Sequence, residues 1–338
     1  MRILIITYYA ETSNYGAILQ AFALQRYLVE QGHNVCFLGS KNSEDREYCN
    51  VFAQKRSEGI TLFRTSNLTV DYDSNNHYDL AIVGSDQVWG GNEKECWGEG
   101  INADYLTTYA PSVGNLVYSS IAWKSFLKGF YGSFKFYKKK KSLQQFDKIS
   151  VRDKQTKILV KNTLKMDVPI VLDPTFLIDW NSISDKRLIQ EDYIVIYSYN
   201  MFSGDIDDVL IAYAKKNNFK IVAINFETEK YDYNAPYSPQ EVLSLFKYAS
   251  MVFTNTFHGT VFSIIFERQF MVPILSGKKD KTYMLLEQLN LKSRAIFKSN
   301  DIINEVNNVI DYTNVKVVID KYLKISKDYL NDCFNLNS

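Results

Sequence analysis

Three consecutive segments near the start of the chain decide the fold: "RILIIT" (2–7), "AILQAFALQRYLVEQG" (17–32) and "HNVCFLG" (33–39). The first is a short apolar, β-branched run, which is typical of a buried parallel strand, and the third has the pattern of the next strand. The second places its apolar residues near helical spacing and ends at Gly32, which suits the end of a helix. A strand, a helix and a second strand in this order begin a doubly wound α/β domain.

The alternation of strands and helices continues through two series. The first includes the strands in "YDLAIVGSDQVW" (78–89) and "VPIVLDPTFLI" (168–178). The second begins at "DYIVIYSYN" (192–200) and includes the strand "SMVFTN" (250–255), which is followed by the helix "GTVFSIIFER" (259–268). We therefore predict an α/β protein with two Rossmann-like domains that face a cleft, with sites beyond the carboxyl ends of the strands.

The two series meet near residues 176–192, and this sets the expected domain boundaries. We expect an N-terminal Rossmann-like domain over residues 1–178 and a C-terminal one over residues 190–300. The remaining residues, 301–338, are expected to form a helical tail that packs back on the domains. A helix in the second domain should begin at Ser238, because Glu241 three residues later completes a capping-box pattern.

Composition and charge narrow the class of protein. The net charge of +1 and the charged fraction of 23% do not indicate a nucleic-acid partner. The four cysteines are scattered and form no C-x-x-C pair, which argues against a zinc site. The apolar run in "MRILIITYYAE" is too short for the core of a signal peptide, and no run approaches the roughly 18 apolar residues of a transmembrane helix. We therefore expect a cytoplasmic protein with reduced thiols.

Residues 123–141 combine seven lysines and seven aromatic residues without any carboxylate. Lysine together with aromatic residues is typical of contact with an anionic membrane surface, here the inner face of the cytoplasmic membrane. The alternative is a solvated basic helix whose aromatic side chains pack inward. Single-stranded nucleic acid would also suit this composition, but no RNA-binding signature accompanies it, so no nucleic-acid partner is expected.

The loop "TNTFHGT" (254–260) is the first candidate site, because it joins a strand to the beginning of a helix. The free N–H groups and positive dipole end of such a helix favour an anion. Gly259 would let a ligand approach the backbone, and His258 can donate to an anionic oxygen or transfer a proton. The alternative is a histidine that caps the helix and satisfies a buried carbonyl. The local sequence does not decide between the two.

Arg152, in "ISVRDKQT" (149–156), is the second candidate. An arginine at the end of a strand can bind a carboxylate or phosphate through two N–H groups. The alternative, which the spacing alone favours, is a surface ion pair with Asp153 or a charge at the start of a helix.

Two strand-ending loops of the first series offer polar and aromatic side chains. The turn "SNYGA" is not G-x-G-x-x-G, which argues against a dinucleotide, and Asn14 and Tyr15 could bind a sugar hydroxyl or cap the helix. In "GSDQVW", Asp86 could act as a base or orient a hydroxyl, and Trp89 could stack on a sugar ring. The alternative is an Asx-type turn with a tryptophan in the core.

Taken in order, these segments resemble the polysaccharide pyruvyl transferase family. The resemblance runs from the N-terminus to about residue 290 and is carried by "NYGAILQAFALQ" (14–25), "DLAIVGSDQVW" (79–89), "YAPSVGN" (109–115), "FDKISVRDKQT" (146–156), "VLDPTFLI" (171–178) and "TNTFHGTVFSIIF" (254–266). It implies a fold like that of the GT-B glycosyltransferases. It also implies transfer of pyruvate from phosphoenolpyruvate to two hydroxyls of one sugar, with formation of a cyclic ketal and release of phosphate. The acceptor would be a lipid-linked or nucleotide-linked precursor of a bacterial cell-surface polysaccharide, such as an exopolysaccharide or a capsule.

The same resemblance implies a donor site. His258 would contact phosphoenolpyruvate and act as general acid or base, and Arg152 would hold the donor's carboxylate or phosphate as the second catalytic residue. This chain has Asp153 where the family's ISVRE motif has Glu. The donor site would be completed by Gly259, Thr260 and one lysine of the segment "SGKKDK", which offers Lys278, Lys279 and Lys281, with Lys281 preferred and Lys278 second.

The acceptor would lie against the N-terminal domain. Our candidates for acceptor-binding residues there are Asn14, Tyr15, Gly16, Ser85, Asp86 and Trp89. No metal and no cofactor is required, with phosphoenolpyruvate as co-substrate, because lysine, arginine and helix dipoles can neutralise the phosphate.

Two alternatives stay open. The first is a GT-B glycosyltransferase that uses a nucleotide sugar, for which Glu241 in "YSPQEV" would be the ribose-binding carboxylate. The second is a non-catalytic saccharide-binding member of a polysaccharide assembly complex.

Overall fold

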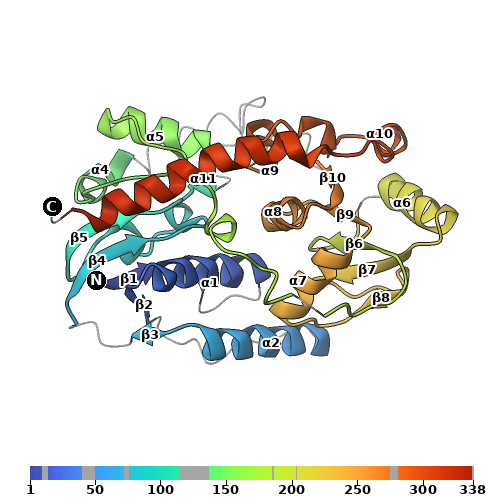
Figure 1. Ribbon diagram of the computed structural model, residues 1–338, viewed down its shortest axis with the longest axis horizontal. Helices are drawn as coiled ribbons and strands as arrows, with labels where there is room; N and C mark the ends of the chain where they lie inside the picture. The colour runs from blue at the N-terminus through green and yellow to red at the C-terminus, as the bar shows by residue number, and fades with distance from the viewer. Residues whose placement is uncertain are drawn as a thin grey trace. The chain divides into compact units, whose positions relative to one another are not determined.

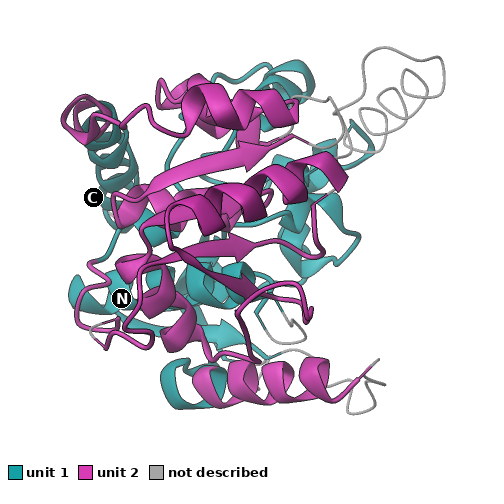
Figure 2. Cartoon of the chain, turned by 90° about the vertical axis from the view of Figure 1, so that its right-hand side faces the viewer, with its two compact units in different colours: residues 1–45, 64–178, 318–338 teal, residues 46–63, 179–317 magenta. Residues whose placement is uncertain are grey.

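A computed structural model describes residues 1–9, 14–39, 50–71, 76–114, 137–184, 186–202, 204–274 and 281–336 (Figure 1). The chain divides into two compact units (Figure 2). Unit 1 consists of residues 1–45, 64–178 and 318–338, and unit 2 consists of residues 46–63 and 179–317.

Unit 1 is built on a five-stranded sheet with the strand order β3-β2-β1-β4-β5, in which all paired strands are parallel. Its strands are β1 (Arg2–Ile6), β2 (Asn34–Leu38), β3 (Val70–Asp71), β4 (Tyr78–Val83) and β5 (Ala103–Thr108). The opening strand–helix–strand segment is confirmed, because β1 and β2 pair in parallel and helix α1 (Tyr15–Glu30) joins them.

Gly32 ends α1 as its sequence position predicted. It has a φ of 85°, a left-handed conformation that glycine adopts at little cost. The N–H groups of Gly32 and His33 donate to the carbonyls of Val29 and Leu28, the paired bonds of a Schellman motif. The described residues of this unit also form the helices α4 (Lys140–Leu143) and α5 (Lys154–Leu164) and the 3-10 turns η1 (Val88–Gly90), η2 (Glu95–Trp97) and η4 (Pro174–Phe176), and parts of two further helices that both units share.

Unit 2 contains a six-stranded sheet with the order β11-β10-β9-β6-β7-β8, again with all paired strands parallel. Its strands are β6 (Tyr193–Tyr197), β7 (Lys220–Ile224), β8 (Tyr233–Asn234), β9 (Met251–Thr254), β10 (Gln269–Pro273) and β11 (Ala295–Ile296). The helices that lie wholly within the described part of this unit are α6 (Gly204–Lys216), α7 (Pro239–Tyr248), α8 (Phe257–Ile265), α9 (Lys281–Gln288), α10 (Ser299–Glu305) and the 3-10 turn η5 (Lys292–Arg294). Each unit is thus an α/β layer structure with a parallel sheet, as predicted.

The expected capping box of α7 is confirmed. The Ser238 hydroxyl accepts from the Glu241 N–H, and the Glu241 carboxylate accepts from the Ser238 N–H at 2.7 Å. Glu241 therefore helps to cap the helix through one of its two carboxylate oxygens.

The chain passes from unit 1 to unit 2 after Ile178, where the sequence analysis ended its first domain. The grouping of residues 46–63 with unit 2 was not foreseen. These residues include most of helix α2 (Val51–Asn67), in which Arg56 donates a hydrogen bond to the carbonyl of Asn225. A contact across so large a sequence separation has no local signature.

The C-terminal tail divides between the units at residues 317 and 318, within helix α11 (Tyr312–Phe334). At its start, the Tyr312 hydroxyl donates to the carbonyls of Ser263 and Arg268 in unit 2. Further along, Ser326 accepts from the N–H of Leu172 in unit 1. Each part of the tail therefore contributes to the unit with which it is grouped.

In the described part of the chain, none of the helices has both the length and the apolar character needed to cross a membrane. The expected membrane-contacting segment 123–141 lies outside the described residues except for 137–141. Within that remainder, Lys139 pairs with Glu99 at 2.9 Å and lies over the ring of Trp97. Peripheral membrane contact stays a prediction from the sequence.

Candidate functional site

Helix α8 begins directly after β9, at the carboxyl edge of the unit 2 sheet. Thr256 is its N-cap, and the Thr256 hydroxyl accepts from the N–H of Gly259 at 3.0 Å. His258 occupies the first turn and is 5% exposed. Because Thr256 caps the helix, the alternative in which His258 serves as the cap is wrong.

Gly259 and Thr260 are occupied by contacts within the protein, which are close packing at Gly259 and a hydrogen bond from Thr260. A Cβ at Gly259 would lie 2.6 Å from Tyr197 Cδ1 and 2.7 Å from Thr256 Oγ1, and closer still to Thr254 Oγ1. The hydroxyl of Thr260 donates to the carbonyl of Thr256 at 3.1 Å, and Thr260 is fully buried. The expectation that Gly259 lets a ligand approach is therefore wrong on this face, since the space is filled by packing against β6 and β9.

Lys281 lies close to the same helix start. Its Nζ is 5.6 Å from the centre of the Phe257 ring, and the Phe257 and His258 rings meet edge to face at 5.3 Å. A cation over an aromatic face is an attractive arrangement. The structure thus brings the preferred lysine and His258 together around Phe257, whereas Lys278 and Lys279 lie outside the described residues.

The edge of unit 2 at β9 therefore gathers a lysine, a histidine and a helix N-terminus. All three favour a negatively charged ligand. Phe257, which the sequence analysis did not single out, positions the two side chains relative to each other. The aromatic residue directly before His258 in the F-H-G-T segment was the feature of the sequence that could have indicated this contact.

Arg152 in unit 1 lies in a buried ion cluster. Its Nη1 donates to Asp173 Oδ2 at 2.7 Å, its Nη2 lies 3.6 Å from Asp86 Oδ1, and its side chain is 4% exposed. Ser85 supports the same carboxylate by donating to Asp173 Oδ2 at 3.1 Å. The alternative of a surface pair with Asp153 is wrong, because Asp153 instead caps α5 by accepting from the N–H of Thr156 at 2.8 Å.

The charges of this cluster are strongly coupled. Burial lowers the pKa of Arg152, but the carboxylates of Asp173 and Asp86 raise it by more, so the net shift is upward and the guanidinium stays charged. With one cation and two carboxylates, the cluster has a formal charge of −1. It is therefore not, by charge alone, a site for an anionic ligand.

Asp86 is the member of the cluster that retains some exposure, 13% of its side chain. It adopts a left-handed backbone with a φ of 73°, which is unfavourable for a residue other than glycine. Its carbonyl accepts from the N–H of Ser112, and Thr7 donates to the neighbouring carbonyl of Ser85. These hydrogen bonds hold the turn in place, and aspartate adopts a left-handed backbone more readily than most residues other than glycine.

The other predicted acceptor residues have structural roles. Asn14 is the N-cap of α1 and accepts from the N–H of Gly16, so the capping alternative holds for it. Tyr15 is 1% exposed. The hydroxyl of Ser85 is fully buried and is committed to Asp173.

Trp89 was expected to offer a flat surface to a sugar ring, and this is wrong. It is 1% exposed, its Nε1 donates to the carbonyl of Cys96 at 3.0 Å, and its ring stacks on Trp97. The ring lies in the core of unit 1, where its burial removes apolar surface from water. It therefore presents no face to a sugar.

Asp173 is a member of this ion cluster that the sequence analysis did not single out. The sequence analysis placed it in the expected strand of 168–178, which is wrong, because the structure has there only an isolated bridge at Ile170 and the turn η4. The other oxygen of Asp173 accepts from the N–H and hydroxyl of Thr175, so both of its oxygens are satisfied in the interior. The D-P-T turn was a signal for such local capping, but nothing in it pointed to Arg152.

Among the residues that the structure describes, no group of three or more His, Cys, Asp and Glu side chains could hold a metal ion. The described cysteines, Cys36, Cys96 and Cys333, are buried free thiols.

The fold is that of the GT-B glycosyltransferases and sugar-nucleotide epimerases. The structure is similar to the glycotransferase of kitacinnamycin, with a TM-score of 0.53, 9% identity and coverage of 99% of this chain and 98% of that one. It is also similar to UDP-GlcNAc 2-epimerase from Neisseria meningitidis, solved with UDP-GlcNAc bound, with a TM-score of 0.52, 8% identity and coverage of 98% and 100%. A third similar structure is the wall teichoic acid polymerase TagF, with a TM-score of 0.51, 10% identity and coverage of 99% and 89%. At such low identity these likenesses show the fold alone.

The sequence identifies the family within this class. The family described as polysaccharide pyruvyl transferase matches residues 14–272, which is most of the 338-residue chain. The chain belongs to this family, whose members are transferases that act on polysaccharide. No protein with a curated sequence matches the chain.

Proposed function

We propose that the protein transfers pyruvate from phosphoenolpyruvate to a saccharide of a bacterial cell-surface polysaccharide precursor, forming a cyclic ketal and releasing phosphate. Family membership supports pyruvylation of a saccharide. The observation that carries the choice of donor is the convergence of His258, Lys281 and the first turn of α8 at one sheet edge. Phosphoenolpyruvate has a carboxylate and a phosphate, and both suit a cation and a helix N-terminus.

The reaction requires controlled movement of protons. The methylene carbon of phosphoenolpyruvate gains a proton, which creates an oxocarbenium-like centre that one sugar hydroxyl attacks. The second hydroxyl then displaces the phosphate, so two hydroxyl protons are released while one is taken up by carbon and one by phosphate. His258 is the side chain that we assign to this acid–base work, because an imidazole nitrogen can donate or accept a proton and the side chain lies in the first turn of α8.

In unit 1 we infer a role for the ion cluster that differs from the expectation from the sequence. Since two carboxylates already face the Arg152 guanidinium, Arg152 would hold Asp86 in position rather than bind the anionic donor. Asp86 would accept a hydrogen bond, and then a proton, from an acceptor hydroxyl.

The test is a phosphate-release assay with phosphoenolpyruvate and a panel of lipid-linked and nucleotide-linked saccharides. His258→Ala should lower the rate by about 10²-fold or more, the usual effect of losing an acid–base group. The matched control is His77→Ala, which removes a histidine whose side chain is 56% exposed and which pairs with Asp104. Near-normal phosphate release by the folded His258→Ala variant would contradict the assigned role.

A second candidate, supported by the fold, is a GT-B glycosyltransferase that uses a nucleotide sugar. One of the similar structures has UDP-GlcNAc bound. Binding of UDP or GDP without binding of phosphoenolpyruvate would favour this candidate. A non-catalytic saccharide-binding protein would instead release no phosphate with any acceptor.

A further inference from the structure

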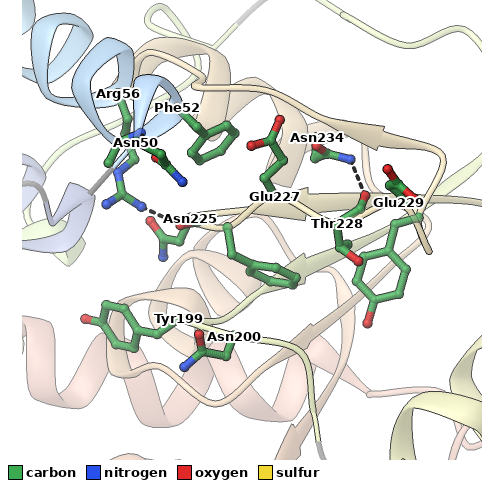
Figure 3. Close-up of a pocket in the computed structure, with 13 residues that line it drawn as sticks. Asn50, Phe52, Arg56, Tyr199, Asn200, Asn225, Glu227, Thr228, Glu229 and Asn234 are labelled. Carbon is green, nitrogen blue, oxygen red and sulfur yellow. Dashed lines mark hydrogen bonds between the residues drawn. The ribbon is translucent and has the colours of Figure 1, made fainter. Parts of the chain in front are cut away.

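Unit 2 has a cavity of about 790 Å³ that the proposed donor residues do not line (Figure 3). It lies at the carboxyl ends of β6 and β7, on the same sheet edge as the start of α8, and the beginning of α2 forms part of its wall. Its volume is within the range of ligand-binding pockets. All of its described lining residues belong to unit 2.

The walls of the cavity are tied together by hydrogen bonds. Arg56 on α2 donates to the carbonyl of Asn225, the residue that follows β7 (Figure 3). Asn225 turns the chain there with a φ of 85°, a left-handed conformation that asparagine tolerates better than most residues. Asn234 donates to the carbonyl of Thr228 at 2.8 Å. These bonds connect three separate segments, so the cavity is a preformed feature of unit 2.

The charge of the cavity argues against an anionic ligand. Glu227 and Glu229 both line it and are exposed, whereas Arg56 is the one cation among its described lining residues. The formal charge is therefore −1, and one guanidinium nitrogen is already bonded to the backbone. A phosphate or a second phosphoenolpyruvate would meet net repulsion here. A nucleoside diphosphate would need more cations than this cavity offers.

The uncharged side chains favour a ligand with many hydroxyls. Four asparagines line the cavity, namely Asn50, Asn200, Asn225 and Asn234. An amide both donates and accepts hydrogen bonds, and a carboxylate accepts them, which together match the two-way hydrogen bonding of sugar hydroxyls.

Aromatic rings provide the apolar half of the same recognition. Phe52, Phe226 and Tyr199 line the cavity, and Tyr199 is 59% exposed. In Figure 3, Tyr199 and Asn200 lie on one side of the opening, while Asn50, Phe52 and Arg56 lie on another. A flat ring beside hydrogen-bonding groups can pack on the C–H face of a pyranose while its hydroxyls are bonded at the edge.

We propose that this cavity binds a neutral saccharide unit of the acceptor. It is a saccharide subsite in unit 2, in addition to the hydroxyl-activating role inferred for Asp86 in unit 1. Its part in turnover rests on the proposed function, but the binding of a saccharide does not. The cavity would select neutral sugars over uronic acids and over sugar phosphates because of Glu227 and Glu229.

The experiment measures saccharide binding to the intact chain in the absence of phosphoenolpyruvate. Methyl glycosides of galactose, glucose, mannose and N-acetylglucosamine are titrated by calorimetry and by ligand-observed NMR, alongside UDP, GDP and inorganic phosphate. Tyr199→Ala and Glu227→Gln should each weaken binding of the preferred glycoside by about tenfold, the effect of losing one good contact. Both positions are exposed, so neither change should impair folding.

Two matched controls remove similar groups elsewhere in unit 2. Phe297→Ala deletes an aromatic ring that is 48% exposed just after β11, at the opposite edge strand of the sheet from β8. Glu287→Gln neutralises an exposed carboxylate on α9. Neither change should alter glycoside binding.

The outcomes separate this inference from the proposed function. The inference is overturned if no glycoside binds, if Tyr199→Ala and Glu227→Gln bind as the wild type does, or if UDP or phosphate binds with the same dependence on these variants. If the glycoside binds in the cavity but no acceptor gives phosphate release, the inference stands and the proposed function fails. If phosphate is released and the variants leave the KM for the acceptor unchanged, the proposed function stands and the inference fails.

Discussion

The loop after β4 in unit 1 and the turn after β9 in unit 2 both follow the carboxyl end of a parallel strand, but the charged side chains gathered at the two places differ in net sign. In unit 1, the loop after β4 presents Asp86 beside Arg152, and Asp173 makes the cluster net negative. In unit 2, the turn after β9 leads into α8, where His258 and Lys281 meet around Phe257. On charge alone, the start of α8 in unit 2 favours an anionic ligand, whereas the net negative cluster of unit 1 does not.

The two edges also differ in how their charges are held. Arg152 and Asp173 are buried and bonded to each other, so each is needed to neutralise the other. Lys281 is half-buried and lies over an aromatic ring. Substitutions in unit 1 should therefore change the stability of the fold first, and substitutions in unit 2 should change ligand binding first.

The largest expected effect is that of Arg152→Ala on stability. Removing the guanidinium leaves Asp173 buried without its cation, and losing one member of a buried ion pair typically costs about 3–5 kcal/mol. Urea unfolding followed by circular dichroism would measure the change. The matched control is Arg26→Ala, because Arg26 pairs with Glu30 on the exposed surface of α1 and such a pair contributes about 0.5 kcal/mol or less.

A loss in Arg152→Ala no greater than in Arg26→Ala would contradict the comparison. It would mean that the cluster in unit 1 is not constrained by its ion pairs. Arg152 would then be available to bind an anionic donor, as the sequence analysis first expected.

The sequence was sufficient where the pattern is local. The opening strand–helix–strand segment, the capping box at Ser238 and the start of a helix near His258 were all visible within short windows. Apolar periodicity and capping residues determine such features, and both can be read along the chain. The resemblance of the ordered segments to a known family additionally predicted a GT-B-like fold.

The sequence was insufficient where distant residues meet. Arg152 and Asp173 are brought together by tertiary packing, and the sequence around either residue does not predict that the other is its partner. Trp89 ends the segment "GSDQVW", and this segment does not predict whether the ring points into the core or toward solvent. The cavity of unit 2 combines α2 with loops after β6 and β7, each of which has the composition of an ordinary polar loop.

A smaller effect, on binding alone, is expected for Lys281→Ala. Loss of one charge-assisted contact to phosphoenolpyruvate should raise its KM by about tenfold, while the stability changes by no more than about 0.5 kcal/mol. Lys281→Arg, which keeps the cation, should retain most of the affinity. Steady-state phosphate release at varied phosphoenolpyruvate concentration provides the measurement.

The control for Lys281 is Lys292→Ala, which removes an exposed lysine that pairs with Glu287 in the same unit. It should leave the KM for phosphoenolpyruvate unchanged. Equal effects of the two substitutions would show that general charge, rather than the position of Lys281 at the start of α8, attracts the donor.

The smallest expected effect concerns Asp153, which adjoins Arg152 in sequence but serves a helix. Asp153→Ala should lower stability by about 1 kcal/mol, because the N–H of Thr156 loses its capping acceptor. Asp167→Ala is the control, since Asp167 is 66% exposed and pairs with Lys157 on the surface of the same helix. Urea unfolding of both variants should therefore place Asp153→Ala between Asp167→Ala and Arg152→Ala. A loss as large as that of Arg152→Ala would instead make Asp153 part of the ion cluster, and the contrast between the two sheet edges would then have to include a third carboxylate in unit 1.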